Sequence, residues 1–337
     1  MNPFKKLAAV SSIKEIEEQI VRKASDAASR VPFKINEVLT AKRRESVRIR
    51  TLSKSLREHL NRALEVLEAI NRADIFYREF SLLFFDKNSI EESKRKLSKS
   101  IKIVNDLEKS YLREIGKCND VRYLVTLRKQ AYGRIISVLK RVRRQIELAR
   151  NLRENMKRLP DIDRRIPTIV IAGPPNSGKS TLVRRLSTAK VEIASYPFTT
   201  KDISAGHLEL NSCKLQIIDT PGLLDRPMKD RNIIERKAVL CLKHLANVII
   251  FLFDVSYERY YPPEEQINLF REICDLFKDK SIIPVVNKID ITKEENLIRV
   301  IENNLECPLI RISVKKNIGF HDLMNRIREI FHKEDCL

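Results

Sequence analysis

The sequence predicts two architectures in one chain: an antiparallel helical bundle, followed by an α/β domain whose mostly parallel sheet has six strands. Three observations predict this division. Apolar residues recur at helical spacing before Pro160, short β-branched runs alternate with helical stretches after it, and the net charge changes at the same point. We therefore expect one domain over residues 1–160 and a second over 161–337, since 337 residues exceed the usual size of a single core.

Apolar stripes in the first half have the i, i+3, i+4 spacing of helices with one buried face. One stripe covers residues 52–70, another 97–115, and a third lies within 119–157, where arginine occupies many of the remaining positions. Ser89 and Glu92 have the spacing of a capping box, which predicts that the second helix begins beside Ser89. These stripes predict the helices of the bundle.

Short apolar runs in the second half predict the strands of a parallel sheet covered on both faces. A short polar turn after residue 210 predicts that two of these runs form an antiparallel hairpin. The predicted strands are 167–172, 203–210, 214–219, 248–254, 282–287 and 309–313.

Nearly all of the net charge of +20 lies in the first half, which carries 38 Lys and Arg against 20 Asp and Glu, whereas the second half carries 27 against 25. This asymmetry favours a module that binds a polyanion, although a solvated basic helical surface is the alternative. The chain lacks tryptophan and has few aromatic residues, which favours docking on folded RNA over stacking on a single strand. A basic helix on an anionic membrane is the competing interpretation. The candidate RNA-binding residues are Lys42, Arg43, Arg44, Arg48, Lys140, Arg141, Arg143 and Arg144.

Composition narrows the class of protein. No apolar run is long enough to span a bilayer, and the first residues turn charged too early for a secretory signal. The six cysteines are far apart and the five histidines are scattered, so we expect neither a disulfide framework nor a transition-metal site. A cytoplasmic protein, monomeric and not bound to a membrane, is the expectation.

The stretch IAGPPNSGKST contains the pattern G-x-x-x-x-G-K-S directly after the first predicted strand. Gly173 and Gly178 permit backbone angles that let successive amides surround an anion, and the helix that follows adds its positive end. Lys179 would contact the β- and γ-phosphates, and Ser180 would bind Mg²⁺. The predicted phosphate-binding residues are Gly173, Pro174, Pro175, Asn176, Ser177, Gly178, Lys179, Ser180 and Thr181.

Two further motifs predict the base. A carboxylate at Asp290, in the sequence NKID, accepts two hydrogen bonds from guanine that adenine does not offer, a difference that reaches ~10⁴-fold. Lys288 would lie along the purine, and Asn287 would tie the phosphate loop to the base loop. Ser313, Val314 and Lys315 follow the last predicted strand, where the Val314 amide would meet guanine O6. The ligand predicted by these motifs in this order is GTP.

Two segments between these motifs would contact Mg²⁺ and the γ-phosphate; YPFTT would act as a switch, and residues 223–232, after DTPG, would be the second switch. The sequence DTPG places Asp219 at a strand end, where it would hold Mg²⁺ through water, and the amide of Gly222 would reach the γ-phosphate. A threonine of YPFTT would close on Mg²⁺ and the γ-phosphate; we favour Thr200 over Thr199 and leave both open. Lys179, Thr200 and Gly222 are therefore the candidate catalytic residues.

Together these motifs resemble the Obg-like group of translation-factor-class GTPases, and within it the nucleolar GTP-binding protein (Nog) family. The resemblance is carried by RLPDIDRRIPTIVIAGPPNSGKSTLV, SYPFTTKDISAGHLE, QIIDTPGLLDRP and PVVNKIDI, and it extends to AYGRIISVLKR and NPFKKLAAV. It implies a three-helix-type bundle that docks on rRNA of the large ribosomal subunit, ahead of a G domain. The long C-terminal extension of eukaryotic members does not follow Leu337, so we expect an archaeal-type short member.

Two residues bear on hydrolysis. Leu223 stands where many GTPases place a water-orienting glutamine, so we expect slow intrinsic hydrolysis completed by another group or a partner. By resemblance to potassium-activated relatives, Asn176 would help to hold K⁺; alternatively it would only fix the loop.

The function predicted from the sequence is a GTPase switch that binds GTP or GDP with Mg²⁺ and acts in assembly of the large ribosomal subunit precursor through rRNA. Two alternatives stay open: an RNA-docking module that binds GTP with little hydrolysis, and a tRNA-modification or signalling GTPase.

Overall fold

The computed structural model divides the chain into two compact units by internal contact. One holds residues 3–73 and 85–157 and is called the helical unit; the other holds residues 1–2, 74–84 and 158–337 and is called the sheet unit. The structure describes residues 2–333 except 34–35, 164, 196–201, 211–212, 220–223, 232–234, 236–238, 240–241, 293–294 and 306.

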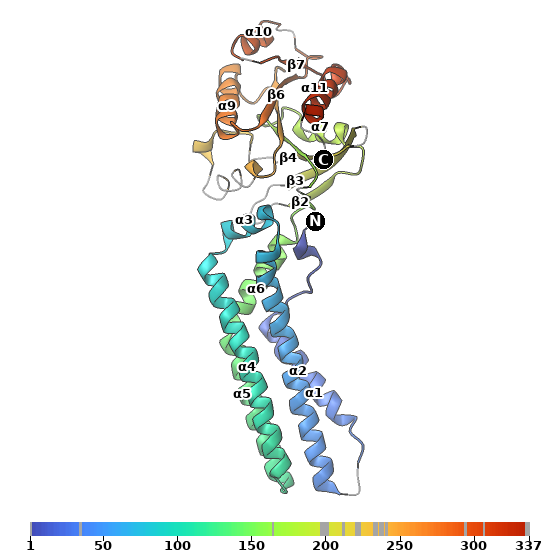
Figure 1. Cartoon of the computed structure of the whole chain (residues 1–337), viewed down its shortest axis with the longest axis vertical. Helices are drawn as coiled ribbons and strands as arrows, with labels where there is room; N and C mark the ends of the chain where they lie inside the picture. The colour runs from blue at the N-terminus through green and yellow to red at the C-terminus, as the bar shows by residue number, and fades with distance from the viewer. Residues whose placement is uncertain are drawn as a thin grey trace. The chain divides into compact units, whose positions relative to one another are not determined.

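The helical unit is an antiparallel bundle, as predicted (Figure 1). In the part of the chain that the structure describes, α1 packs beside α2, and α2 also contacts α4 and α5. With α5 and α6 taken as one broken helix, the described part of the bundle has four helices, one more than the three-helix-type bundle that the resemblance implies. The elements are η1 (Pro3–Lys5), α1 (Ile13–Ser29), α2 (Glu37–Arg72), α4 (Lys87–Lys117), α5 (Val121–Arg141) and α6 (Arg143–Met156).

The predicted stripes form the core of this bundle. Leu52, Leu56 and Leu60 are fully buried on α2, and Leu97 and Val104 are fully buried on α4. Helices with one apolar stripe bury it against each other, because that removes the apolar surface from water at about 25 cal/mol per Å².

Two local predictions for the bundle are corrected. The capping box predicted at Ser89 and Glu92 is wrong, because α4 begins at Lys87 with Asp86 as its N-cap, and the Asp86 side chain accepts a hydrogen bond from the Ser89 amide at 2.8 Å. The long segment after residue 119 is divided at Val142, which lies between α5 and α6 and leaves the helical conformation (φ −99°, ψ 17°).

Helix α3 (Ile75–Phe84) lies inside the predicted helical half of the sequence but belongs to the sheet unit. The Tyr77 hydroxyl donates to the carbonyl of Pro160 and accepts from the amide of Ile162, both at 2.8 Å, and burial raises the pKa of Tyr77. Helix α3 therefore anchors, through this side chain, the segment that leads into the first strand.

The sheet of the second unit has the strand order β2-β3-β4-β1-β5-β6-β7. All six predicted strands are present, and the short strand β2 adds a seventh at the edge. β3 pairs antiparallel with β2 and β4, while the other neighbours are parallel. The strands are β1 (Thr168–Ala172), β2 (Glu192–Ser195), β3 (Asp202–Leu210), β4 (Cys213–Asp219), β5 (Val248–Asp254), β6 (Ser281–Asn287) and β7 (Ile310–Arg311).

Helices cover both faces of this sheet. Alternate residues of β5 point to opposite faces: Ile250 and Leu252 join a core cluster with residues of α7 and α11, whereas the rings of Phe251 and Phe253 contact Phe270 of α9. The remaining elements are α7 (Lys179–Leu186), η2 (Met228–Asp230), α9 (Pro263–Leu276), α10 (Glu295–Asn303) and α11 (Phe320–Lys333). The carboxyl ends of β1, β4, β5 and β6 consequently meet at one edge, where parallel sheets of this type bind ligands.

Candidate nucleotide site

The loop between β1 and α7 adopts the backbone that the glycine spacing predicts. Gly173 and Gly178 have positive φ of 137° and 98°. A Cβ on Gly173 would lie 2.4 Å from the carbonyl oxygen of Leu252, and one on Gly178 would lie 2.4 Å from Nδ2 of Asn287. Only glycine fits at these two positions, because both the conformation and the available space exclude a side chain.

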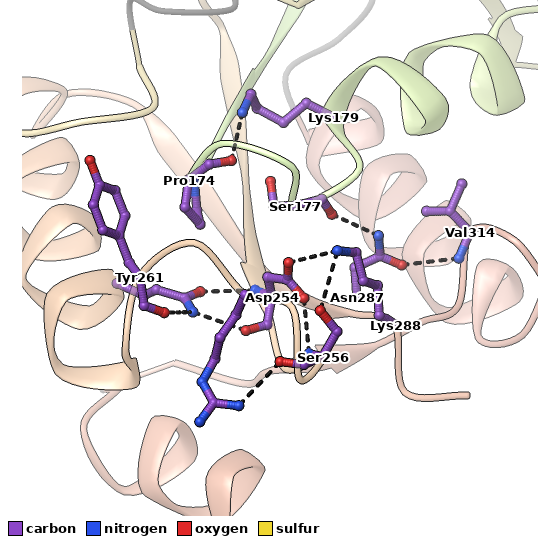
Figure 2. Close-up of polar contacts among 11 residues, drawn as sticks. Pro174, Ser177, Lys179, Asp254, Ser256, Tyr261, Asn287, Lys288 and Val314 are labelled. Atoms are coloured by element: carbon purple, nitrogen blue, oxygen red, sulfur yellow. Dashed lines mark hydrogen bonds and ion pairs between the residues drawn. The ribbon is translucent and has the colours of Figure 1, made fainter. Parts of the chain in front are cut away.

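Lys179, the first residue of α7, turns back into this loop (Figure 2). Its Nζ donates to the carbonyls of Gly173 at 2.9 Å and Pro174 at 2.7 Å. Burial lowers the pKa of Lys179, and the charges of Asp219 and Asp225 oppose that shift. The ammonium group is thus held within the loop, where phosphate oxygens would favour its charged form.

Ser180 and Asp219 lie together at the end of β4. The Ser180 hydroxyl donates to a carboxylate oxygen of Asp219 at 2.5 Å, and the Asp219 side chain is fully buried. A hydroxyl and a carboxylate suit Mg²⁺, which takes oxygen ligands and usually completes its shell with water and substrate phosphates. Groups of three or more His, Cys, Asp or Glu suited to a metal are absent among the described residues.

Asn287, the last residue of β6, connects the phosphate loop to the segment after β7. Its Nδ2 donates to the carbonyl of Ser177 at 2.8 Å, and its Oδ1 accepts from the amide of Val314 at 3.0 Å (Figure 2). This is the connection expected for Asn287. The Val314 amide, for which a contact with guanine O6 is predicted, donates to Asn287 in this structure, and the base contact stays a prediction.

One cleft of about 340 Å³ is surrounded by three of the predicted motifs. The phosphate loop, the NKID sequence and the segment after β7 all contribute side chains, and Glu258 and Ile291 line it as well although no motif singled them out. Its predicted members are Asn176, Gly178, Thr181, Asn287, Lys288, Asp290, Ser313, Val314 and Lys315. Residues from three distant parts of the sequence therefore form one site.

The switch residues fall outside the described residues. Thr199 and Thr200 lie in the undescribed segment 196–201, and Gly222 and Leu223 lie in 220–223. The roles predicted for Lys179, Thr200 and Gly222 in hydrolysis therefore stay predictions. The described residues that border these segments are Ser195, Asp202, Asp219 and Leu224. The carbonyl of Leu224 accepts from the amide of Gly173 at 3.0 Å.

One buried carboxylate at this edge of the sheet lies outside the predicted motifs. Asp254 ends β5 and pairs through Oδ2 with Nζ of Lys288 at 2.7 Å, while Gln266 of α9 bonds the backbone of Asp254. The available signal was an acidic residue at the end of an otherwise apolar strand, VIIFLFD.

Some of the predicted RNA-binding side chains of the helical unit bond to other residues of the protein, and some are exposed. Lys42 donates to the carbonyl of Gly116 at 3.0 Å and to Asn119 at 2.9 Å, and Arg48 pairs with the buried Glu45 at 2.6 Å. Lys140 lies 3.7 Å from Glu17, and Arg44 lies 3.5 Å from the carbonyl of Val31. Exposed side chains are found at Arg43, Lys140, Arg141, Arg143 and Arg144. Lys42 and Arg44 thus bond to other segments of the bundle. Arg141, Arg143 and Arg144 lie on its surface, where Arg143 also pairs with Glu147 at 2.8 Å.

Two protein families match the two halves of the chain. Residues 168–288 match the family described as 50S ribosome-binding GTPase, and residues 4–163 match the NOG1 N-terminal helical domain. The chain therefore belongs to the nucleolar GTP-binding protein (Nog) family of phosphate-loop GTPases. GTPases with a phosphate-binding loop generally use Mg²⁺.

Similar proteins span archaea and eukaryotes. An uncharacterized protein of Methanocaldococcus jannaschii is 36% identical over 88% of this chain and 83% of its own length. Nucleolar GTP-binding protein 1 of Drosophila melanogaster is 28% identical over 94% of this chain and 50% of its own length. The chain spans about half the length of this eukaryotic relative and 44% of the one from Caenorhabditis elegans.

A crystal structure of a nucleolar GTP-binding protein 1 from Plasmodium falciparum is also similar, with 35% identity, a TM-score of 0.44, and coverage of 52% of this chain and 91% of that chain. Within the part of the chain that the structure describes, no helix is both long enough and apolar enough to cross a membrane.

Proposed function

We propose that this chain is a GTP-hydrolysing switch in assembly of the large ribosomal subunit. In this proposal the sheet unit binds and hydrolyses GTP, and the helical unit binds rRNA of the subunit precursor. The carrying observation is that one cleft brings together the phosphate loop, the NKID sequence and the segment after β7. The partner is supported by the positive first half and by the family descriptions, which name a 50S ribosome-binding GTPase and a NOG1 helical domain.

Guanine recognition would rest on Asp290, whose carboxylate accepts from two donors that adenine lacks. The triphosphate would be held by the amides of the phosphate loop and by the ammonium of Lys179, which already lies within that loop. Mg²⁺ would be held by Ser180 and Asp219, with Thr200 as the third predicted protein ligand, and would neutralise charge between the β- and γ-phosphates.

Loss of the γ-phosphate would release Thr200 and the Gly222 amide, which are the predicted sensors of the triphosphate. Binding to the subunit in one nucleotide state and release in the other follows from that change. Intrinsic hydrolysis would be slow, because the apolar side chain of Leu223 cannot orient water, so the ribosome or K⁺ held by Asn176 would complete the site.

The test is single-turnover hydrolysis of GTP by the purified protein, with and without large ribosomal subunits, in KCl and in NaCl. We expect at least tenfold faster turnover with subunits, and binding of the protein to subunits that differs between GTP and GDP. Equal rates in the two salts would remove the role of K⁺ alone. Turnover that stays negligible under all conditions, with unchanged binding to subunits, would favour a docking module that uses GTP as a structural ligand.

A further inference from the structure

We propose that Asp254 and Gln266 are positioning residues for guanine-nucleotide binding, which act by fixing Lys288. The inference rests on the guanine site proposed above, and it concerns two residues that lie outside its motifs.

The topology of the sheet brings Asp254 to the site. β5 and β6 are adjacent parallel strands, and their last paired residues are Asp254 and Asn287. Lys288 follows Asn287 directly, so the carboxylate at the end of one strand stands beside the base loop that begins at the end of the next. An acidic residue one position earlier on β5 would point to the opposite face of the sheet.

Both carboxylate oxygens of Asp254 are engaged. Oδ2 accepts from Nζ of Lys288 at 2.7 Å, and Oδ1 accepts from the amide of Ser256 at 2.9 Å (Figure 2). The Asp254 side chain is fully buried, whereas 24% of the Lys288 side chain is exposed. The buried carboxylate therefore holds the ammonium group of Lys288 in place. The rest of the Lys288 side chain lines the cleft.

Gln266 fixes the backbone of Asp254. It is fully buried on α9, its Oε1 accepts from the Asp254 amide at 2.8 Å, and its Nε2 donates to the carbonyls of Asp254 and Tyr261, both at 2.9 Å. One side chain thus holds the strand end and the loop after it in a single arrangement. Because Gln266 bonds both the amide and the carbonyl of Asp254, it fixes the backbone that carries the carboxylate.

Lys288 itself has little freedom beyond these contacts. Its φ of 69° is in the left-handed region, which a lysine occupies only where its surroundings fix the backbone. Without the carboxylate, the ammonium would turn toward water and carry the stem away from the purine. Binding of the base would then weaken, while the phosphate loop would keep its own contacts.

A purely structural role for Asp254 makes a different prediction, and two ligands separate the roles. GDP uses both the base loop and the phosphate loop, whereas inorganic tripolyphosphate uses only the phosphate loop. Asp254→Asn keeps the shape of the side chain and an acceptor for Ser256 but removes the charge that holds Lys288. We expect about 10- to 100-fold weaker binding of GDP and an unchanged Kd for tripolyphosphate within about twofold, both measured by calorimetry on the full chain.

The matched control is Asp275→Asn, which removes the acidic member of an exposed pair with Lys278 at 3.4 Å on the same domain. It should leave both dissociation constants unchanged. Gln266→Glu keeps the acceptor of the side chain but loses its donor, and it should weaken GDP in the same direction by a smaller factor. If Asp254→Asn does not fold, Gln266→Glu carries the test.

A double-mutant cycle completes the experiment. If Asp254 acts through Lys288, then Asp254→Asn should cost no more than about twofold in GDP affinity once Lys288→Gln is present. Equal weakening of GDP and tripolyphosphate, or full additivity in the cycle, would overturn the positioning role. Wild-type protein that binds ADP as well as GDP would instead refute the guanine site on which the inference rests, so the two failures are distinguishable.

Discussion

In the sheet unit the polar residues of the site lie at the ends of buried strands, whereas the candidate residues of the helical unit lie along the faces of long helices. Asp219, Asp254 and Asn287 each end a strand, and their side chains are buried and bonded. Arg141, Arg143 and Arg144 are exposed around the break between α5 and α6. The first arrangement fixes individual atoms, and the second supplies charge.

This difference teaches where single substitutions should matter. A group whose position is set by strand ends has neighbours that cannot replace it, so its loss leaves buried partners without a hydrogen bond. Each charge on an exposed helical surface contributes one increment among many. Large, specific effects are therefore expected in the sheet unit and small, cumulative effects in the helical unit.

The largest effect is expected for Asp290→Asn. The amide can no longer accept both guanine donors, and one of its own donors meets the N1–H of the base, so GDP affinity should fall about 10³- to 10⁴-fold. Xanthosine diphosphate, which offers an acceptor in place of the 2-amino group, should bind better to the variant than to the wild type. Calorimetry with both nucleotides measures this, and Asp279→Asn, an exposed aspartate beside Lys280 at 3.5 Å, serves as the control. Unaltered preference for guanine would contradict the role of Asp290.

A smaller effect is expected for Tyr77→Phe, which tests whether α3 belongs with the sheet unit. Loss of the hydroxyl removes the acceptor for the buried amide of Ile162 and the donor to Pro160, at a cost of about 1–3 kcal/mol in the free energy of unfolding. Urea denaturation measures the change. Tyr123→Phe, on a side chain of α5 that is 51% exposed, should cost nothing measurable. Equal stability of both variants would mean that the hydrogen bonds of Tyr77 add little to this unit.

The parts of the fold that could be predicted from the sequence are those where the backbone admits only one type of residue. The turn at Gly173 and Gly178 was predictable because only glycine fits its backbone, and Lys179 follows that turn and bonds back into it. Binding of phosphate by these residues stays a prediction. The link that Asn287 makes to the phosphate loop was predictable, since the ends of parallel strands converge on one edge. The strands and the buried stripes of the bundle followed from periodicity.

Sequence reasoning failed where partners are distant or several residues compete. Asp86, Ser89 and Glu92 are all plausible around one helix start, and the choice depends on backbone geometry that spacing does not record. Asp254 and Gln266 meet Lys288 only in the folded sheet, so no local pattern connects them. Helix α3 reads as one more helix of the bundle, although the tertiary contacts of Tyr77 assign it to the other unit.

The smallest effect for each residue is expected on the surface of the helical unit, where Arg141, Arg143 and Arg144 are replaced together by glutamine. If these charges neutralise rRNA phosphates, affinity for large-subunit rRNA should fall. The slope of log K against log salt should also become shallower, by roughly 0.7–0.9 for each phosphate that the variant no longer neutralises. Filter binding across a salt series measures the slope.

The matched control removes three exposed charges from the sheet unit by replacing Lys278, Arg299 and Arg326 with glutamine. Unchanged binding for this triple variant, together with a shallower slope for the first, would show that the helical unit provides a located RNA surface. Equal weakening by both triple variants would mean that RNA responds to net charge alone. The contrast between a unit that fixes atoms and a unit that supplies charge would then fail for RNA binding, because both units would supply charge equally.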